Sequence, residues 1–179
     1  MLKFSIILIF SILSGIAFSA DDELKVGDQS PKFTLKNADD KEYSLEVLLK
    51  KDKATRKVLI LIMGDHTTRD SGNKWAMELH KVHGKDERVK ASMIADLRGL
   101  PFYVTERMVK WGVKREKTPI LILLDWHGKV NQLYKTERGK PNIFIIGDQG
   151  KILYIYKGEC SAKILNTIKA KIQDCLKEN

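Results

Sequence analysis

Residues 57–75 read KVLILIMGDHTTRDSGNKW, and this stretch decides the fold. The apolar run from Val58 to Met63 predicts a strand buried on both faces. A polar loop from Gly64 to Ser71 is expected next, and apolar residues then recur at helical spacing: Trp75, Leu79 and Val82. In α/β proteins, loops that follow a central strand carry the chemistry, because free backbone N–H groups and a helix dipole converge there. We therefore look for function between residues 64 and 71.

Composition indicates one ordinary domain behind an export signal. The chain has 179 residues, of which 43% are hydrophobic and 31% charged. Its first residues place Lys3 before an apolar run from Phe4 to Phe18, and small residues lead to Ala20. This layout predicts a signal peptide over residues 1–20, with an uncleaved anchor as the alternative, and a domain over residues 21–179. The mature protein is expected to be exported, periplasmic or secreted, with no membrane span after signal removal.

The charge balance is basic, with 32 Lys and Arg against 23 Asp and Glu and a formal net charge of +9. Such an excess could favour a phosphate-rich or anionic lipid surface. Nucleic acid is not an expected partner for an exported protein. The cations are spread through the whole chain, so a solvated surface is the simpler interpretation.

The remaining pattern alternates strands with helices. Strands are predicted around Phe33 and Leu35 and at Val89–Ala95, Ile120–Leu124, Ile143–Ile146 and Ile152–Tyr156. Helices are predicted from Ser44, at Tyr103–Trp111 and at Ser161–Lys177. In the second of these helices, Val104, Met108 and Trp111 form an apolar stripe. The turn at 147–150 joins the last two strands as a hairpin. This order predicts an α/β fold whose mixed sheet is covered on both faces.

Three segments carry a resemblance to the redoxins, which comprise the peroxiredoxins and the TlpA/ResA-type periplasmic thioredoxins. The segments are Val26-Gly27-Asp28 with Ser30-Pro31 and Phe33-Thr34-Leu35, then Pro119 to Asp125 with Gly128-Lys129-Val130, and Pro141 to Ile146 with Gly150-Lys151-Ile152. The resemblance implies a thioredoxin-like three-layer α/β/α sandwich with a central mixed sheet. In layout the chain is also similar to the YtfJ-type periplasmic proteins, whose loop lacks a CxxC.

The residues that carry redoxin chemistry are missing. Those reactions need a thiolate at the amino end of the first long helix. When His66 to Asp70 is laid over the CxxC of the TlpA type, Thr67 and Asp70 occupy the cysteine positions; over the TxxC of peroxiredoxins, Asp70 replaces the peroxidatic cysteine. No cysteine precedes Cys160. We therefore expect a non-catalytic protein that needs no cofactor and binds a protein or peptide of the cell envelope through this former active-site loop.

The loop itself allows several interpretations. Its polar residues are Asp65, His66, Thr67, Thr68, Arg69 and Asp70. Asp70 most simply caps the helix. Asp65, His66 and Asp70, helped by His80 or His83, could instead hold a divalent metal, although no spacing matches a known ligand motif and no metal is predicted. Thr67, Thr68 and Arg69 would suit an anion.

The two cysteines, Cys160 and Cys175, bracket one predicted helix. Fifteen positions at about 1.5 Å each put them about 22 Å apart, whereas a disulfide spans Cα distances up to about 7 Å. Cys175 follows the apolar stripe and is expected to be a buried small hydrophobe. Cys160 should return to the edge of the old active site and open a helix. It is either a tolerated loop residue or a displaced redox thiol, and the second option defines the alternative function, a divergent thiol oxidoreductase.

By resemblance, Pro141 is the cis-proline of the thioredoxin fold. Thr118-Pro119 is a competing candidate. Together with Thr67 and Asp70, Lys140-Pro141 would border a shallow groove for an extended peptide.

Overall fold

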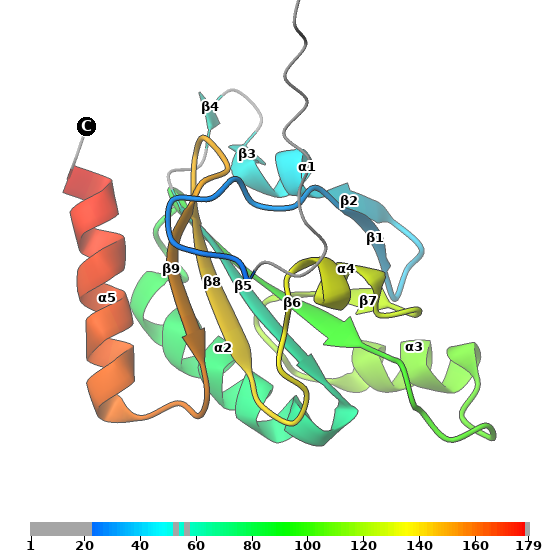
Figure 1. Ribbon diagram of the computed structural model, residues 1–179. Helices are drawn as coiled ribbons and strands as arrows, with labels where there is room; N and C mark the ends of the chain where they lie inside the picture. Colours follow the sequence, from blue (N-terminus) through cyan, green and yellow to red (C-terminus); the bar gives the residue numbers. More distant parts are fainter. Residues whose placement is uncertain (1–22, 52–53, 56–57, 178–179) are drawn as a thin grey trace, which may run out of the picture.

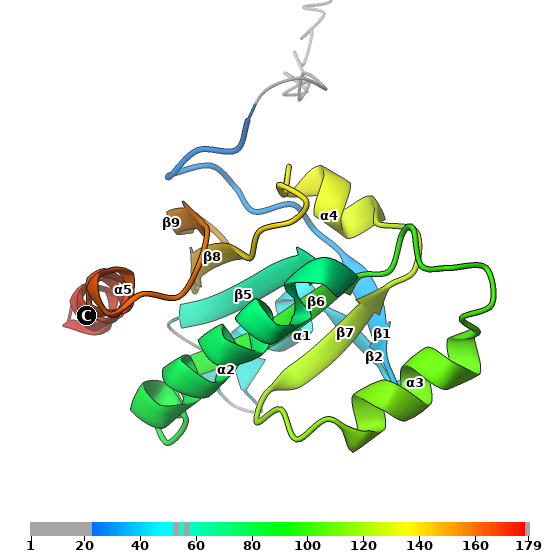
Figure 2. The ribbon, with the colours of Figure 1, turned by 90° about the horizontal axis from the view of Figure 1, so that it is seen from below.

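The computed structural model describes residues 23–51, 54–55 and 58–177. The predicted signal peptide at residues 1–20 lies outside them. The described chain forms a seven-stranded mixed sheet in the order β2-β1-β7-β6-β5-β8-β9, with helices on both faces (Figures 1 and 2). This confirms the predicted three-layer α/β/α arrangement.

The sheet strands are β1 (Thr34–Asn37), β2 (Glu42–Ser44), β5 (Val58–Asp65), β6 (Val89–Asp96), β7 (Leu121–Asp125), β8 (Asn142–Gly147) and β9 (Ile152–Lys157). The helices are α1 (Leu45–Leu49), the 3-10 turn η1 (His66–Thr68), α2 (Arg69–His83), α3 (Glu106–Arg115), α4 (Lys129–Leu133) and α5 (Ala162–Lys177). A separate ribbon pairs β3 (Lys50–Lys51) with β4 (Ala54–Thr55).

The central strand is β5, which pairs parallel with β6 and antiparallel with β8. Its side chains alternate between two cores. Ile60 and Ile62 pack into one core, and Leu59, Leu61 and Met63 pack into the other. Burial on both faces explains the unbroken apolar run, because no position between 58 and 63 faces water.

Each core is closed by its own set of helices. The α2 and α5 side chains Trp75, Leu79, Ile168 and Ile172 fill the first core. The α1 residues Leu45, Leu48 and Leu49 fill the second, together with Leu24, Phe33 and Tyr134. The residues of both described cores lie between positions 24 and 176, so a chain that begins at Asp21 contains every one of these core residues. No helix within the described ranges has the length and apolarity needed to cross a membrane.

The first helix and the hairpin follow their predictions. The Ser44 hydroxyl caps α1 by accepting a bond from the Val47 N–H at 3.2 Å. The turn between β8 and β9 places Gly150 at φ +76°, a conformation that favours glycine.

The start of α2 differs from its prediction. Residues expected in a loop up to Ser71 instead form η1 and the first turn of α2, which begins at Arg69. Its apolar face also differs, because Val82 is 42% exposed while His83 is buried. His83 lies four positions after Leu79 and so shares its face, whereas Val82 is turned toward solvent.

The apolar stripe predicted for α3 is also wrong. The helix begins at Glu106 because the Thr105 hydroxyl accepts a bond from the Met108 N–H at 3.3 Å. None of its residues is buried, and Met108 and Trp111 are 53% and 61% exposed. Ion pairs to the β1–β2 turn hold the helix in place: Lys110 with Asp40 at 2.6 Å, and Lys114 with Asp39 at 2.7 Å.

Replacing Trp75 by Phe should lower the free energy of unfolding by about 1–3 kcal/mol. The indole is fully buried, donates to the Gly158 carbonyl at 3.1 Å and meets Tyr156 edge to face, so Phe loses the bond and leaves a void. Urea unfolding followed by circular dichroism measures the change. The matched control, Trp111→Phe on the surface, should change it by no more than about 0.5 kcal/mol. Equal effects of the two substitutions would contradict the assignment of Trp75 to the core.

Candidate functional site

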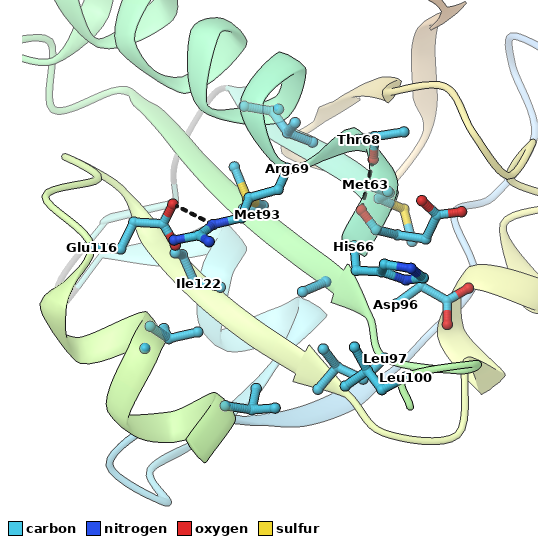
Figure 3. A pocket seen from close by; sticks show the side chains of 18 of the residues that line it. Met63, His66, Thr68, Arg69, Met93, Asp96, Leu97, Leu100, Glu116 and Ile122 are labelled. Atoms are coloured by element: carbon cyan, nitrogen blue, oxygen red, sulfur yellow. Dashed lines mark hydrogen bonds and ion pairs between the residues drawn. The ribbon is translucent and has the colours of Figure 1, made fainter. Parts of the chain in front are cut away.

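An apolar pocket of about 340 Å³ opens at the carboxyl ends of β5 and β6, beside the start of α2. Ile62, Met93 and Ile122 of the sheet line its inner wall. Its side walls come from α2, from α3 and from the loop that carries Leu97 and Leu100. Figure 3 shows these side chains around the space. This is the position at which we expected function, although nothing in the sequence indicated a cavity.

The pocket exists because three small residues face it from three elements. They are Gly72 on α2, Ala95 on β6 and Gly112 on α3. A Cβ added at Gly72 would touch the Met93 side chain, whereas one added at Gly112 would meet nothing within 4 Å. The helix α3 therefore bridges the pocket without filling it.

Polar side chains stand at the rim. His66 is exposed, and both His66 and Asp96 line the pocket (Figure 3). At the opposite end, the Arg69 Nε donates to the Glu116 carboxylate at 3.0 Å, and Asn73 bonds to the same oxygen. Glu116 thus ties the start of α2 to the end of α3 across the pocket.

Asp65 holds the site together. Its Oδ1 accepts bonds from the Thr67 N–H at 3.0 Å and the Thr67 hydroxyl at 2.5 Å. Its Oδ2 accepts the Gly139 N–H at 3.1 Å and lies 3.4 Å from the Arg138 Nε. Burial by itself would raise the pKa of this carboxyl, but these donors and the Arg138 charge outweigh burial and hold the pKa of Asp65 below its usual range.

Two further aspartates, which the sequence analysis missed, share this edge. Asp96 and Asp125 end β6 and β7 in register with Asp65. Asp96 accepts bonds from the backbone and guanidinium of Arg98, and Asp125 accepts two from Asn131 at 2.9 and 3.0 Å. Each carboxylate fixes the loop that follows its strand. The sequence could have pointed to these aspartates, because each of the three apolar runs ends in Asp.

The former active-site loop is compact and its roles differ from those expected. The Thr68 hydroxyl donates to the Asp65 carbonyl at 2.9 Å, and it lies so close to Gly64 that no Cβ could be added there. Asp70 was expected to cap the helix but lies exposed within the first turn of α2. The side-chain cap belongs to Asp65, which caps η1. Asp70 still places negative charge at the positive end of the helix dipole.

The metal interpretation finds no support in the part of the chain that the structure describes. No group of three His, Cys, Asp or Glu side chains there could hold an ion. His80 and His83 belong to the last turn of α2, far along the helix from His66. The carboxylates nearest to His66 already bind protein donors.

The cis-proline prediction is wrong for both candidates. None of the peptide bonds in the described ranges is cis, so Pro141 and Pro119 follow trans bonds. Trans is the intrinsically preferred form. The turn before β8 is shaped instead by buried Asn142, which donates to the carbonyls of Lys140 at 2.7 Å and Glu137 at 2.9 Å. Pro141 does line the pocket, beside Asp65 and Thr68.

Cys160 lies close to α2 but inside the core. The loop that carries it is fixed by the Trp75 bond to Gly158 and by a bond from the Ser71 hydroxyl to Glu159 at 2.9 Å. Cys160 is 6% exposed, and burial raises the pKa of its thiol. The helix α5 begins two residues later, at Ala162. Neither cysteine forms a disulfide in the described chain, and Cys175 is only partly buried at the edge of the same core.

Asp65→Asn should lower the free energy of unfolding by about 1–3 kcal/mol at neutral pH, because the amide's NH₂ would face the donors of Gly139 and Arg138. The folded pKa of Asp65 is depressed, so the unfolded chain takes up its proton first as the pH falls. The stability that the carboxylate contributes is therefore present above the usual Asp pKa of about 3.9 and is lost below it. Urea unfolding at several pH values should show the parent and the variant converging in acid.

Asp70→Asn is the matched control, since Asp70 is exposed on the next turn. It should cost less than about 1 kcal/mol. A constant gap between parent and Asp65→Asn at all pH values would show that the charge of Asp65 does not matter.

Comparison with protein-family models gives no match, and comparison with curated proteins gives none either. Solved structures do match. A candidate thiol:disulfide interchange protein DsbE from Chlorobium tepidum is 18% identical, with a TM-score of 0.64 over 86% of this chain and 99% of its own. A candidate thioredoxin from Neisseria meningitidis is 20% identical, with a TM-score of 0.61 over 84% and 91%.

A peroxiredoxin-like protein from Aquifex aeolicus is 17% identical, with a TM-score of 0.56 over 85% of this chain and 90% of its own. These identities support the fold alone. Cys160 and Cys175 are the two cysteines of the sequence, and they form no pair. The chain therefore has the thioredoxin-like fold of these redox proteins and lacks the CxxC.

Proposed function

We propose that this is an exported, non-catalytic thioredoxin-fold protein that binds an apolar segment of a protein or peptide through its former active-site edge. The observation that carries the proposal is the pocket of about 340 Å³, which opens beside the former active-site loop and is lined by His66, Thr68 and Arg69 but not by Thr67 or Asp70. The first 20 residues, with their signal-peptide layout, support export.

The residue types support a binding role over a catalytic one. Asp70 and Thr67 stand where thiols would be needed, and neither can attack a disulfide or a peroxide as a thiolate does. Cys160 gains no support as a substitute, because burial and a raised pKa both suppress the thiolate. The polar groups around Asp65 are bonded to it, so this carboxylate is engaged in holding the loop.

The pocket's size and walls suit a bulky apolar side chain. Binding pockets are commonly about 300–1,000 Å³ with apolar walls and a few polar groups. Here the walls are Ile, Met, Leu and Val, and the polar groups His66, Arg69 and Glu116 stand at the mouth. A Phe, Leu or Met side chain could enter while its backbone stays at the rim.

Plugging the pocket should abolish binding without unfolding the protein. Gly112→Leu projects a side chain into open space from α3. Gly112→Ala adds only one methyl group and should raise helix stability by about 0.5–1 kcal/mol, because glycine is costly in a helix interior. Short extended peptides with a central Phe, titrated against isotope-labelled protein, should shift the amide resonances of Gly72 and Ala95 in the parent and in Gly112→Ala, but not in Gly112→Leu.

Ala170→Leu is the control for an added leucine, because Ala170 is exposed on α5. It should bind as the parent does. Peptides with a central Ser in place of Phe should cause no shift. Unchanged binding by Gly112→Leu, or no binding by any peptide, would refute the proposed role of the pocket.

Alkylation should leave Cys160 unmodified in the native protein and modify it in urea. Buried thiols with a raised pKa react slowly, and unfolding exposes them. Iodoacetamide followed by peptide mass mapping assigns the modified cysteine, with Cys160→Ser as the control. Rapid native modification of Cys160, together with disulfide or peroxide turnover lost in Cys160→Ser, would favour the thiol oxidoreductase instead.

A further inference from the structure

Large aromatic side chains are exposed on α3 and in the loop before it. Phe102 is 100% exposed and Tyr103 65% exposed in the loop before α3, and their rings meet edge to face. Trp111, on the outer side of α3, is 61% exposed, whereas Met108 lines the pocket. We call Phe102, Tyr103 and Trp111 the α3 surface. Three exposed aromatic side chains are not explained by the fold.

Unpaired cations border the α3 surface. Within the described chain, Arg107 and Lys117 have no ion-pair partner, and the Arg115 guanidinium lies 4.4 Å from the centre of the Trp111 ring. Lys110, by contrast, is paired with both Asp40 and Glu106, and Lys114 is paired with Asp39. These two lysines and three carboxylates leave one negative charge against the three cations Arg107, Arg115 and Lys117, so the charge left over is positive.

The α3 surface also projects. In both ribbon views α3 and the loop before it form one end of the molecule, beyond the sheet (Figures 1 and 2). The loop tip protrudes and its Phe is fully exposed, so the tip itself forms no pocket or groove into which a rigid partner could fit. A bilayer interface accepts such side chains, since its headgroup region admits aromatic rings and its anionic lipids attract Lys and Arg.

We propose that the α3 surface binds the headgroup region of anionic lipid bilayers. Phe102, Tyr103 and Trp111 enter the interface, while Arg107, Arg115 and Lys117 lie at the level of the lipid phosphates. The outer side of α3 supports this geometry because Trp111 lies among cations: its ring contacts the Arg115 guanidinium, and it shares a surface hollow with Arg107. The sequence has a formal net charge of +9, or +8 without Lys3 of the predicted signal peptide, which adds long-range attraction.

This inference does not depend on the proposed peptide pocket. On α3 the pocket is lined by Met108, Val109, Gly112 and Val113, and none of the three exposed rings lines it. Gly112→Leu should therefore bind vesicles as the parent does, whatever its effect on peptide binding.

The test uses protein from Asp21 onward and co-sedimentation with two kinds of vesicle, phosphatidylcholine alone and phosphatidylcholine mixed with phosphatidylglycerol. The parent should bind only the mixed vesicles, with a blue shift of tryptophan fluorescence that is absent in Trp111→Phe. Phe102→Ser combined with Trp111→Ser should weaken binding about tenfold or more. Vesicle binding should weaken about fivefold on each single replacement of a cation: Arg107→Gln, Arg115→Gln or Lys117→Gln. Added salt should weaken vesicle binding further.

Two controls separate this surface from general effects. The first control replaces three exposed lysines of α5 by glutamine: Lys163, Lys171 and Lys177. It removes as much charge as Arg107→Gln, Arg115→Gln and Lys117→Gln combined in one variant. It should weaken binding less than that triple variant at the α3 surface. Val26→Ser with Leu133→Ser removes exposed apolar side chains elsewhere and should leave binding unchanged. All variants should keep the parent's thermal unfolding midpoint, because the altered side chains are exposed.

Four results would overturn the proposal. They are no binding to mixed vesicles, equal binding to both kinds of vesicle, equal loss in the α5 control, and a dimer in sedimentation that dissociates when Phe102 and Trp111 are replaced. The last result would show that the α3 surface is a contact between two copies of the chain.

Discussion

The carboxylate of Asp65 joins the three segments that make the site. It ends β5, caps η1 through Thr67, and holds the turn before β8 through Gly139 and Arg138. Each of these bonds opposes the cost of burying a charge, and together they keep the carboxyl ionised. If this carboxylate were unpaired, the start of α2 and the turn at Pro141 would have no common anchor, and the mouth of the pocket would lose its shape.

The same network bears on the proposed binding role of this edge. The carboxylates of Asp65, Asp96 and Asp125 all accept bonds from backbone or side-chain donors, so they are engaged in holding the loops. The walls of the pocket are apolar and include small residues. In the proposed function such a surface would recognise shape and hydrophobicity, and the rim residues His66 and Arg69 would add polar contacts.

How far the sequence could predict this structure depends on what each residue contacts. The strand at Val58 and the hairpin at Gly150 were predictable, because burial on both faces leaves an apolar run and a turn leaves its glycine. The α3 stripe failed because helical periodicity does not tell whether an apolar face meets a core or solvent. The pocket was not predictable, since Gly72, Ala95 and Gly112 come together only after folding. The aspartates at strand ends could have been found from their repeated position.

The helix α3 connects the two proposed surfaces. None of its residues is buried, and polar contacts at its ends hold it: Lys110 and Lys114 bind the β1–β2 turn, and Glu116 follows its last residue and binds Arg69. Its inner side is also in apolar contact, because Val113 packs against the first core, while Trp111 stays exposed. One helix thus presents different side chains to the two proposed surfaces, so a substitution at Gly112 can fill the pocket and leave the exposed Trp111 ring in place.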